Sequence, residues 1–188
     1  PQPRTFRAEA DRALARAEAF LERSSGPWFL WVHLYDVHLP HSAPPGEVQP
    51  FESGALSGLP DPCAYADHPA VPVGPGGMPI FRRGRDSRDC AASPPFIQKL
   101  ASYRAEVARS DRAVGALVDA VERSAWGGLE RTAVIVTSDH GESLTEHSSR
   151  LSHQFSSYET VLRVPLVVVP PGGVSPVERR DLVELRDL

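Results

Sequence analysis

The most informative part of the chain reads TAVIVTSDHGESLTEH and covers residues 132–147. Its first six residues are mainly apolar and β-branched, which indicates a buried strand. Two further apolar runs of strand length lie at residues 28–34 and 164–169. The chain therefore contains three candidate strands, and the run at 132–137 leads directly into polar residues.

Segments with the apolar spacing of helices precede these strands. Residues 6–23 and 95–123 carry apolar side chains at steps of three and four, and a shorter helix is expected at 156–162. This alternation predicts an α/β fold, a mostly parallel sheet with crossover helices. Ligands gather beyond the carboxyl ends of the strands in such sheets, so the polar residues after each strand are the first candidates for a site.

Length and charge limit the classes of function. The 188 residues are enough for one domain with a core, and a net charge of −4 offers no basic surface for nucleic acid. No apolar run approaches the roughly 18 residues that a membrane span needs. The chain starts with PQPR and shows no signal-peptide pattern, so we interpret the amino terminus as a cut within a larger domain.

Residues 41–95 are rich in proline and glycine and have little periodicity. This composition predicts a long irregular insertion between the first strand and the second long helix. The two cysteines, Cys63 and Cys90, both lie within it. Two unpaired thiols and a disulfide that closes the loop are both compatible with the sequence.

Asp139 and His140 are the strongest candidate metal ligands. They follow the 132–137 strand consecutively, and a carboxylate beside an imidazole suits a divalent ion such as Mn²⁺, Zn²⁺ or Ca²⁺. Gly141 is expected to let the backbone turn sharply behind them. The alternative is that Asp139 caps a following helix while His140 is a surface residue. A serine-hydrolase triad is excluded at residues 138–140, because adjacent side chains cannot align as nucleophile, base and orienter.

Other histidines and glutamates near the predicted strand ends are further candidate site residues. His38 lies after the first strand and is a candidate to bind an anionic oxygen or to protonate a leaving group, with a loop-ordering hydrogen bond as the alternative. His153 is a second, weaker candidate, whereas His33 is expected to be a core histidine. Glu142 is either an additional ligand or a solvated residue in the first turn of a helix; Glu146 and His147 are likewise potential ligands.

Four segments together resemble the sulfatase family of the alkaline-phosphatase superfamily. The first reads WFLWVHLYDVHLP, and the third, TSDHGESLTEH, is close to the family pattern TSDHGExLGEH. The second is the Tyr-x-x-Glu-Val helix motif, and the fourth is Tyr-Glu followed by Arg-Val-Pro-Leu. In chain order the four segments lie at residues 28–40, 103–117, 137–147 and 158–166. Their order and spacing make the combined match specific, although each alone would be weak.

The resemblance implies roles for four residues. Asp139 and His140 would be metal ligands, and His38 and His153 would be catalytic residues that contact the sulfate or the leaving-group oxygen. The ion would be Ca²⁺ first, with Mn²⁺ or Zn²⁺ as alternatives, and would neutralise charge on the transferring group. The substrate would be a small-molecule or glycan sulfate ester. Family membership also suggests a periplasmic or extracellular location.

The family nucleophile, a formylglycine made from cysteine in C-x-P/A-x-R, has no match in this chain. Cys90 begins a partial match, but Pro94 stands where the signal needs arginine. We therefore expect residues 1–188 to be the carboxyl-terminal part of the catalytic domain, with the nucleophile segment upstream. Alternatives are a phosphodiesterase or phosphonate monoester hydrolase of the same superfamily, a more distant phosphoethanolamine or glycerol-phosphate transferase, and a non-catalytic binding remnant.

Overall fold

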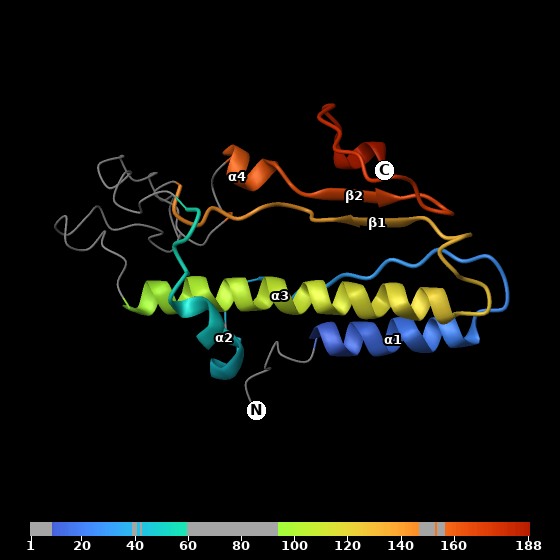
Figure 1. Ribbon diagram of the computed structural model, residues 1–188, viewed down its shortest axis with the longest axis horizontal. Coiled ribbons are helices and arrows are strands. Elements are labelled where there is room, and N and C mark those ends of the chain that lie inside the picture. The colour runs from blue at the N-terminus through green and yellow to red at the C-terminus, as the bar shows by residue number, and fades with distance from the viewer. Residues whose placement is uncertain (1–8, 39–40, 42, 60–93, 147–152, 154–156) are drawn as a thin grey trace, which may run out of the picture.

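The computed structural model describes residues 9–38, 41, 43–59, 94–146, 153 and 157–188. Two long helices lie side by side under a pair of short strands, as Figure 1 shows. In chain order the elements are α1 (Glu9–Arg23), α2 (Pro45–Glu52), α3 (Pro94–Arg123), β1 (Val134–Thr137), α4 (Glu159–Leu162), β2 (Leu166–Val169) and the 3₁₀ turn η2 (Leu185–Asp187). None of the helices in these residues is long and apolar enough to cross a membrane.

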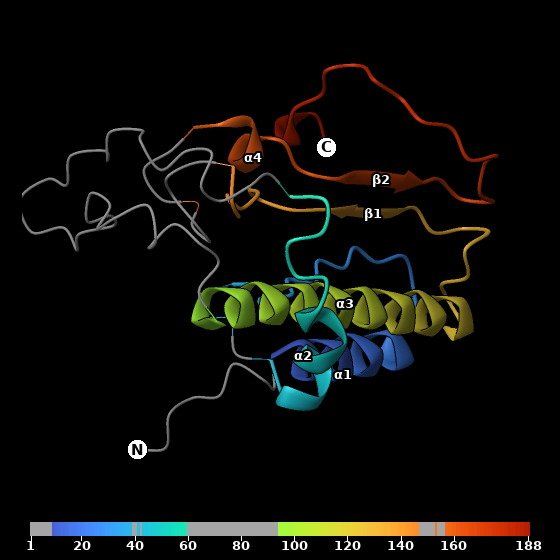
Figure 2. The same ribbon diagram turned by 60° about the vertical axis from the view of Figure 1, so that its left-hand side comes forward.

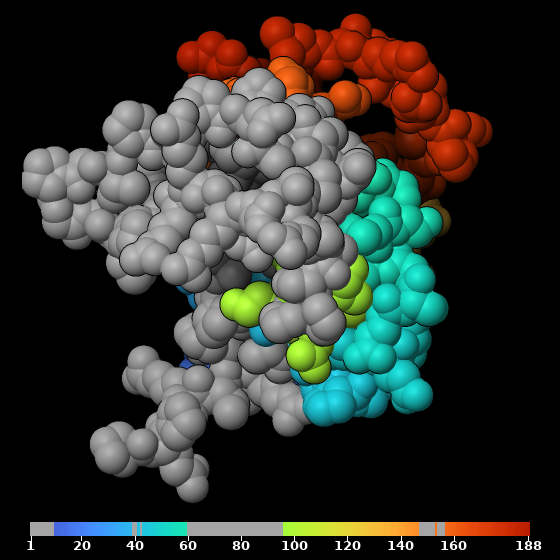
Figure 3. Space-filling model, turned by 90° about the vertical axis from the view of Figure 1, so that its left-hand side faces the viewer, coloured from blue at the N-terminus to red at the C-terminus, as the bar shows by residue number. Residues whose placement is uncertain are grey.

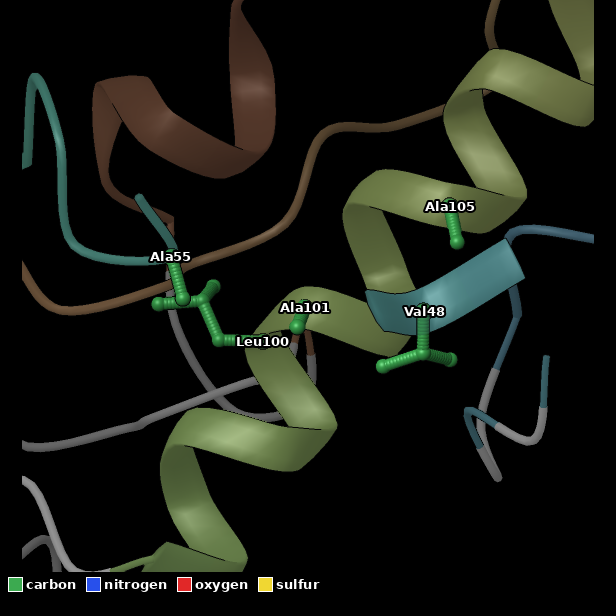
Figure 4. Close-up of a cluster of buried hydrophobic side chains, with 5 residues drawn as sticks. All are labelled: Val48, Ala55, Leu100, Ala101 and Ala105. Carbon is green, nitrogen blue, oxygen red and sulfur yellow. The ribbon is translucent and has the colours of Figure 1, made fainter. Parts of the chain in front are cut away.

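Helix α3 is the central element of the structure. Its first half packs against α2 and the residues after it, where Leu100 and Ala101 are fully buried against Val48 and Ala55 (Figure 4). Its second half packs against α1 through Ala120, Val121 and Leu21. Alanines contribute three of the five buried residues in the first contact, whereas the second depends mainly on larger aliphatic side chains. The space-filling view in Figure 3 shows the α2 region (cyan to teal) directly beside the first turns of α3 (green).

The helices agree with the sequence prediction, apart from α2. Helix α3 was expected at 95–123 and is confirmed, and α1 ends at Arg23 as expected. Helix α2 was missed, because the abundance of proline in residues 41–95 was interpreted as irregular structure. Pro45 occupies the first turn of α2, where a missing N–H costs nothing, and Glu47 in the same turn favours the helix dipole. The remainder of the insertion, with Cys63 and Cys90, lies outside the described residues.

Strands β1 and β2 pair antiparallel, with Thr137 opposite Leu166 and Val134 opposite Val169. The prediction of a parallel sheet is therefore wrong for this pair. Helix α4 is only four residues, about 6 Å, long and does not carry the chain back along β1, so the chain enters β2 at the end where β1 leaves. Side chains of β1 alternate between partly buried and exposed, which differs from the expected burial on both faces.

Residues 28–34 are extended but form no strand ladder in the described structure. Trp28 and Leu30 pack on α1 and α3, whereas Phe29 and Trp31 are 84% and 80% exposed. The prediction of a strand buried on both faces is wrong here, because only one side of the segment is covered. The segment runs back along α3 in the same direction as β1, which Figures 1 and 2 show.

Candidate functional site

The polar loop after β1 is held in place by short backbone contacts. The Ser138 hydroxyl donates to the His140 carbonyl oxygen at 2.6 Å, and the His140 N–H donates to Asp139 Oδ1 at 3.0 Å. The Gly141 N–H donates to the Val161 carbonyl oxygen of α4 at 2.7 Å. Among the described residues no helix follows Asp139 until α4, so the alternative in which Asp139 caps the next helix is wrong.

Gly141 is required for a reason different from the one that the sequence suggested. Its backbone does not adopt the left-handed conformation that favours glycine. Instead, a β-carbon at this position would overlap with the carbonyl oxygen of Thr160 and lie 3.4 Å from that of Arg163. Glycine therefore permits the loop to lie directly against α4, which fixes the position of its two neighbours, His140 and Glu142.

Glu146 stabilises the far end of this loop. Its Oε2 accepts hydrogen bonds from the N–H groups of Leu144 at 2.8 Å and Thr145 at 3.0 Å. Ser143 and Thr145 are fully buried. The Glu146 carboxylate thus holds the backbone of the loop through its Oε2 atom.

Three of the predicted site residues lie together. The His140 and His153 rings have centroids 4.0 Å apart, and the His38 and His153 rings 5.5 Å apart. Tyr35 stacks on His38 with centroids 4.5 Å apart and planes within 15°. Residues that are more than 100 positions apart in the sequence therefore form one imidazole cluster. His33 lies outside it and is exposed, so its prediction as a core histidine is wrong.

Asp139 borders this cluster through His140. Its Oδ1 lies 3.8 Å from His140 Nε2, and its side chain is 72% exposed. The Nδ1 atom of His140 lies 2.8 Å from the Gly141 carbonyl oxygen, which can only accept, so in the neutral ring Nδ1 carries the proton and Nε2 has the lone pair. The carboxylate and the basic ring nitrogen can thus meet at one ion.

The loop that carries His38 is attached to α3 by two buried polar contacts. Asp36 lies 3.7 Å from Arg109, whose guanidinium also contacts Glu47 of α2 at 2.6 Å. His41 Nδ1 lies 2.7 Å from Glu106 Oε2, and both side chains are almost completely buried. These contacts lie on either side of His38 in the sequence, so they fix the backbone on both sides of it.

Burial and hydrogen bonding shift the pKa values of three residues where the His38 loop meets α3. Desolvation raises the pKa of the Asp36 carboxyl, although a hydrogen bond from the Ala10 backbone and the charge of Arg109 act in the opposite direction. The hydrogen bond to Glu47 raises the pKa of Arg109. Burial also raises the pKa of Tyr103, which packs edge-on against His41, and the Glu142 carboxylate raises it further. Tyr103 is therefore a neutral hydroxyl beside the site.

Comparison with known proteins identifies the family. The family model described as Sulfatase matches residues 2–188. The chain belongs to the sulfatase family. This confirms the resemblance of the four motifs and implies the α/β architecture of that family.

Several sulfatases are similar to this chain over part of their length. Mouse iduronate 2-sulfatase is 30% identical over 84% of this chain and 29% of its own length. Arylsulfatase K of Xenopus laevis is 29% identical over 95% of this chain and 34% of its own length, and the bovine protein is 36% identical over 47% and 16%. The chain thus spans about a sixth to a third of the relatives it matches. No solved structure matches it significantly.

The residues of this sulfatase chain fit part of a divalent-metal site. Asp139 and His140 supply one hard oxygen and one imidazole nitrogen, the donor types that Ca²⁺, Mn²⁺ or Zn²⁺ accept in different proportions. Within the described residues no group of three or more His, Cys, Asp or Glu could hold an ion. His147 falls outside those residues.

Sequence reasoning missed the buried supports of the site. Glu106 was part of the Tyr-x-x-Glu-Val motif but was given no role, and Arg109 was not singled out. Glu142 was expected to be either an additional ligand or a solvated residue of a helical turn; its side chain is 7% exposed and lies beside His153, so the solvated alternative is wrong. The family motif was the sequence signal that could have identified Glu106.

Proposed function

We propose that this chain carries part of the active site of a sulfate-ester hydrolase. The observation that supports the proposal most directly is the convergence of His38, His140 and His153, with the Asp139 carboxylate at its border. The names of the similar relatives favour sulfate over phosphate esters.

Each residue has a distinct role in this proposal. Asp139 and His140 hold one divalent ion, Ca²⁺ first and Mn²⁺ or Zn²⁺ as alternatives, and a bound ion supplies charge neutralisation at the transferring group. His38 and His153 contact the sulfate oxygens, and one of them donates a proton to the oxygen that leaves when the S–O bond breaks. The nucleophile, a formylglycine, belongs to the intact protein upstream of this chain.

The substrate is proposed to be a sulfated small molecule or glycan. Iduronate 2-sulfatase is named for a sulfate ester on a sugar acid, and it aligns with 84% of this chain. Sulfated uronic acids are therefore the first glycans to test. We further propose that the insertion at residues 41–95 shapes access to the site.

The decisive experiment measures hydrolysis by the intact protein. A panel should contain an aryl sulfate, a 2-sulfated uronate disaccharide, a phosphate diester and a phosphonate monoester, each tested after chelation and after addition of Ca²⁺, Mn²⁺ or Zn²⁺. We expect sulfate-ester turnover that chelation abolishes. Preference for the phosphate diester or the phosphonate would instead support the phosphodiesterase alternative, and no turnover of any ester would support the binding remnant.

Two substitutions localise the activity. Asp139→Asn and His140→Ala should each lower kcat/KM on the order of 100-fold or more, the effect that loss of transition-state charge stabilisation has in other enzymes. Asp181→Asn changes the same kind of carboxylate at an exposed position of the carboxyl-terminal segment and should leave turnover unchanged. We expect no turnover from residues 1–188 alone, because neither cysteine stands in the modification sequence.

A further inference from the structure

Glu142 is a buried carboxylate without an ordinary structural use. Its side chain is only 7% exposed, and its Oε2 lies 3.3 Å from Nδ1 of His153. Its second oxygen, Oε1, is buried without a hydrogen-bond partner. Burying a carboxylate with one oxygen unsatisfied costs folding free energy. Stability alone therefore does not explain the position of Glu142, which directs attention to its contact with His153.

The neighbouring Glu146 shows what a structural carboxylate does in the same loop. Glu146 accepts two backbone N–H groups and so fixes the chain at Leu144 and Thr145. Among the described residues Glu142 accepts no backbone N–H, and its hydrogen-bond partner is the imidazole of His153. The two glutamates of this loop therefore differ in what they contact: Glu146 holds the backbone, and Glu142 contacts a side chain of the histidine cluster.

The contact determines the orientation and the tautomer of His153. A carboxylate can only accept, so Nδ1 of the neutral ring must carry the proton and Nε2 must carry the lone pair. The His153 ring is also bounded by His140, at a centroid distance of 4.0 Å, and by His38 at 5.5 Å. With Nδ1 directed at Glu142, the opposite nitrogen is the one available to a ligand.

We infer that Glu142 is a positioning residue for His153: by accepting from Nδ1–H it holds the ring so that Nε2 is presented to the sulfate or the leaving-group oxygen, to which the protonated ring donates its Nε2–H. This inference rests on the function proposed above for the role of His153, but the Glu142–His153 contact itself is a property of this chain. Glu142 thus joins the four proposed site residues as a fifth, and it acts indirectly by orienting His153.

The first test is spectroscopic and needs no activity. Nitrogen NMR of the imidazole rings in the 188-residue chain, at a pH high enough for neutral rings, distinguishes the two tautomers. We expect His153 to be protonated at Nδ1 in the wild type and in Glu142→Gln, whose amide oxygen can accept the same hydrogen bond. In Glu142→Ala we expect a mixture of tautomers or the Nε2–H form, and an unchanged Nδ1–H signal would overturn the inference.

The second test is kinetic and uses the intact protein. Glu142→Ala should lower kcat by about tenfold or more, as loss of an outer-shell partner does elsewhere, with KM changed much less. Glu142→Gln should recover part of that loss. Glu130→Gln, which removes an exposed carboxylate before β1, is the matched control and should behave as wild type. If Glu142→Ala lowers thermal stability but keeps the wild-type kcat, Glu142 is only structural.

The two tests separate this inference from the proposed function. Absence of sulfate-ester turnover in the wild type would refute the proposed function, while the NMR tautomer would still show whether Glu142 orients His153. An active wild type with a normal Glu142→Ala variant would refute the inference alone.

Discussion

Replacing Gly141 by alanine tests how the site loop is held against α4. The added methyl group would overlap with the carbonyl oxygen of Thr160, and would lie 3.2 Å from its carbonyl carbon and 3.4 Å from the Arg163 carbonyl oxygen. All of these are backbone atoms, so no side-chain rotation can relieve the overlap. The loop must move away from α4, and the 2.7 Å hydrogen bond from Gly141 N–H to the Val161 oxygen is lost or stretched.

The size of the effect follows from these two terms. Overpacking of this kind costs about 1–3 kcal/mol, and loss of one hydrogen bond adds about 1 kcal/mol. We therefore expect Gly141→Ala to lower the free energy of unfolding by about 2–4 kcal/mol. The change should also separate His140 from His153, because both neighbours of Gly141 in the chain must follow the loop.

Urea denaturation followed by far-ultraviolet circular dichroism measures this difference. Gly115→Ala is the matched control, because Gly115 lies on the exposed face of α3 with no atom within 4 Å of an added β-carbon. Alanine is favoured over glycine in a helix interior by about 1 kcal/mol, so this variant should be more stable than wild type. The reasoning is refuted if Gly141→Ala unfolds at the wild-type urea concentration.

Three further outcomes are expected. Glu106→Ala removes the buried 2.7 Å contact with His41. In urea denaturation it should lower the free energy of unfolding by about 2–3 kcal/mol, the cost of losing a hydrogen bond to a charged group. A loss smaller than about 0.5 kcal/mol would contradict this. Burial raises the pKa of Asp36 above its ordinary 3.8, so the folded chain binds this proton more tightly and stability falls as pH rises from the ordinary to the raised value. Asp36→Asn lacks this titration and should gain stability relative to wild type as pH rises through and above the ordinary pKa of the carboxyl, whereas a difference that is constant with pH would argue against it. Leu100→Ala, at a fully buried position, should lower the free energy of unfolding by about 2–5 kcal/mol. Trp31→Ala, at an 80% exposed position, should change it by less than about 0.5 kcal/mol. Comparable losses for the two variants in the same urea assay would mean that Trp31 is covered.

Patterns that depend on local periodicity were predicted well. The apolar stripe of α3 identified a helix that begins one residue earlier than expected and ends at Arg123 as predicted. The pairing of β1 with β2 was not predictable in the same way, because an apolar run carries no information on the direction of its partner. Helix α2 was hidden by its own prolines: Pro45 is favourable at the start of a helix, but Pro50 lies inside it, where proline is normally unfavourable.

In the candidate site, too, some features were predictable from local sequence and others were not. Strand ends and motif order pointed to His38, His140 and His153, and the structure brings their rings together. Their roles in binding and catalysis stay predictions. The buried contacts of Glu106 with His41 and of Glu142 with His153 were not predicted, because the identity of a charged residue does not show whether it is buried or solvated.

The amino-acid sequence was sufficient to establish the family, the long helices and the segments from which site residues come. These properties depend on residue order and on local spacing, which a linear chain contains completely. The tertiary structure alone decided that Gly141 is required by the Thr160 carbonyl and that Glu142 faces an imidazole. Contacts of this kind join backbone and side chains across separate elements, and they exist only after the helices and strands have packed.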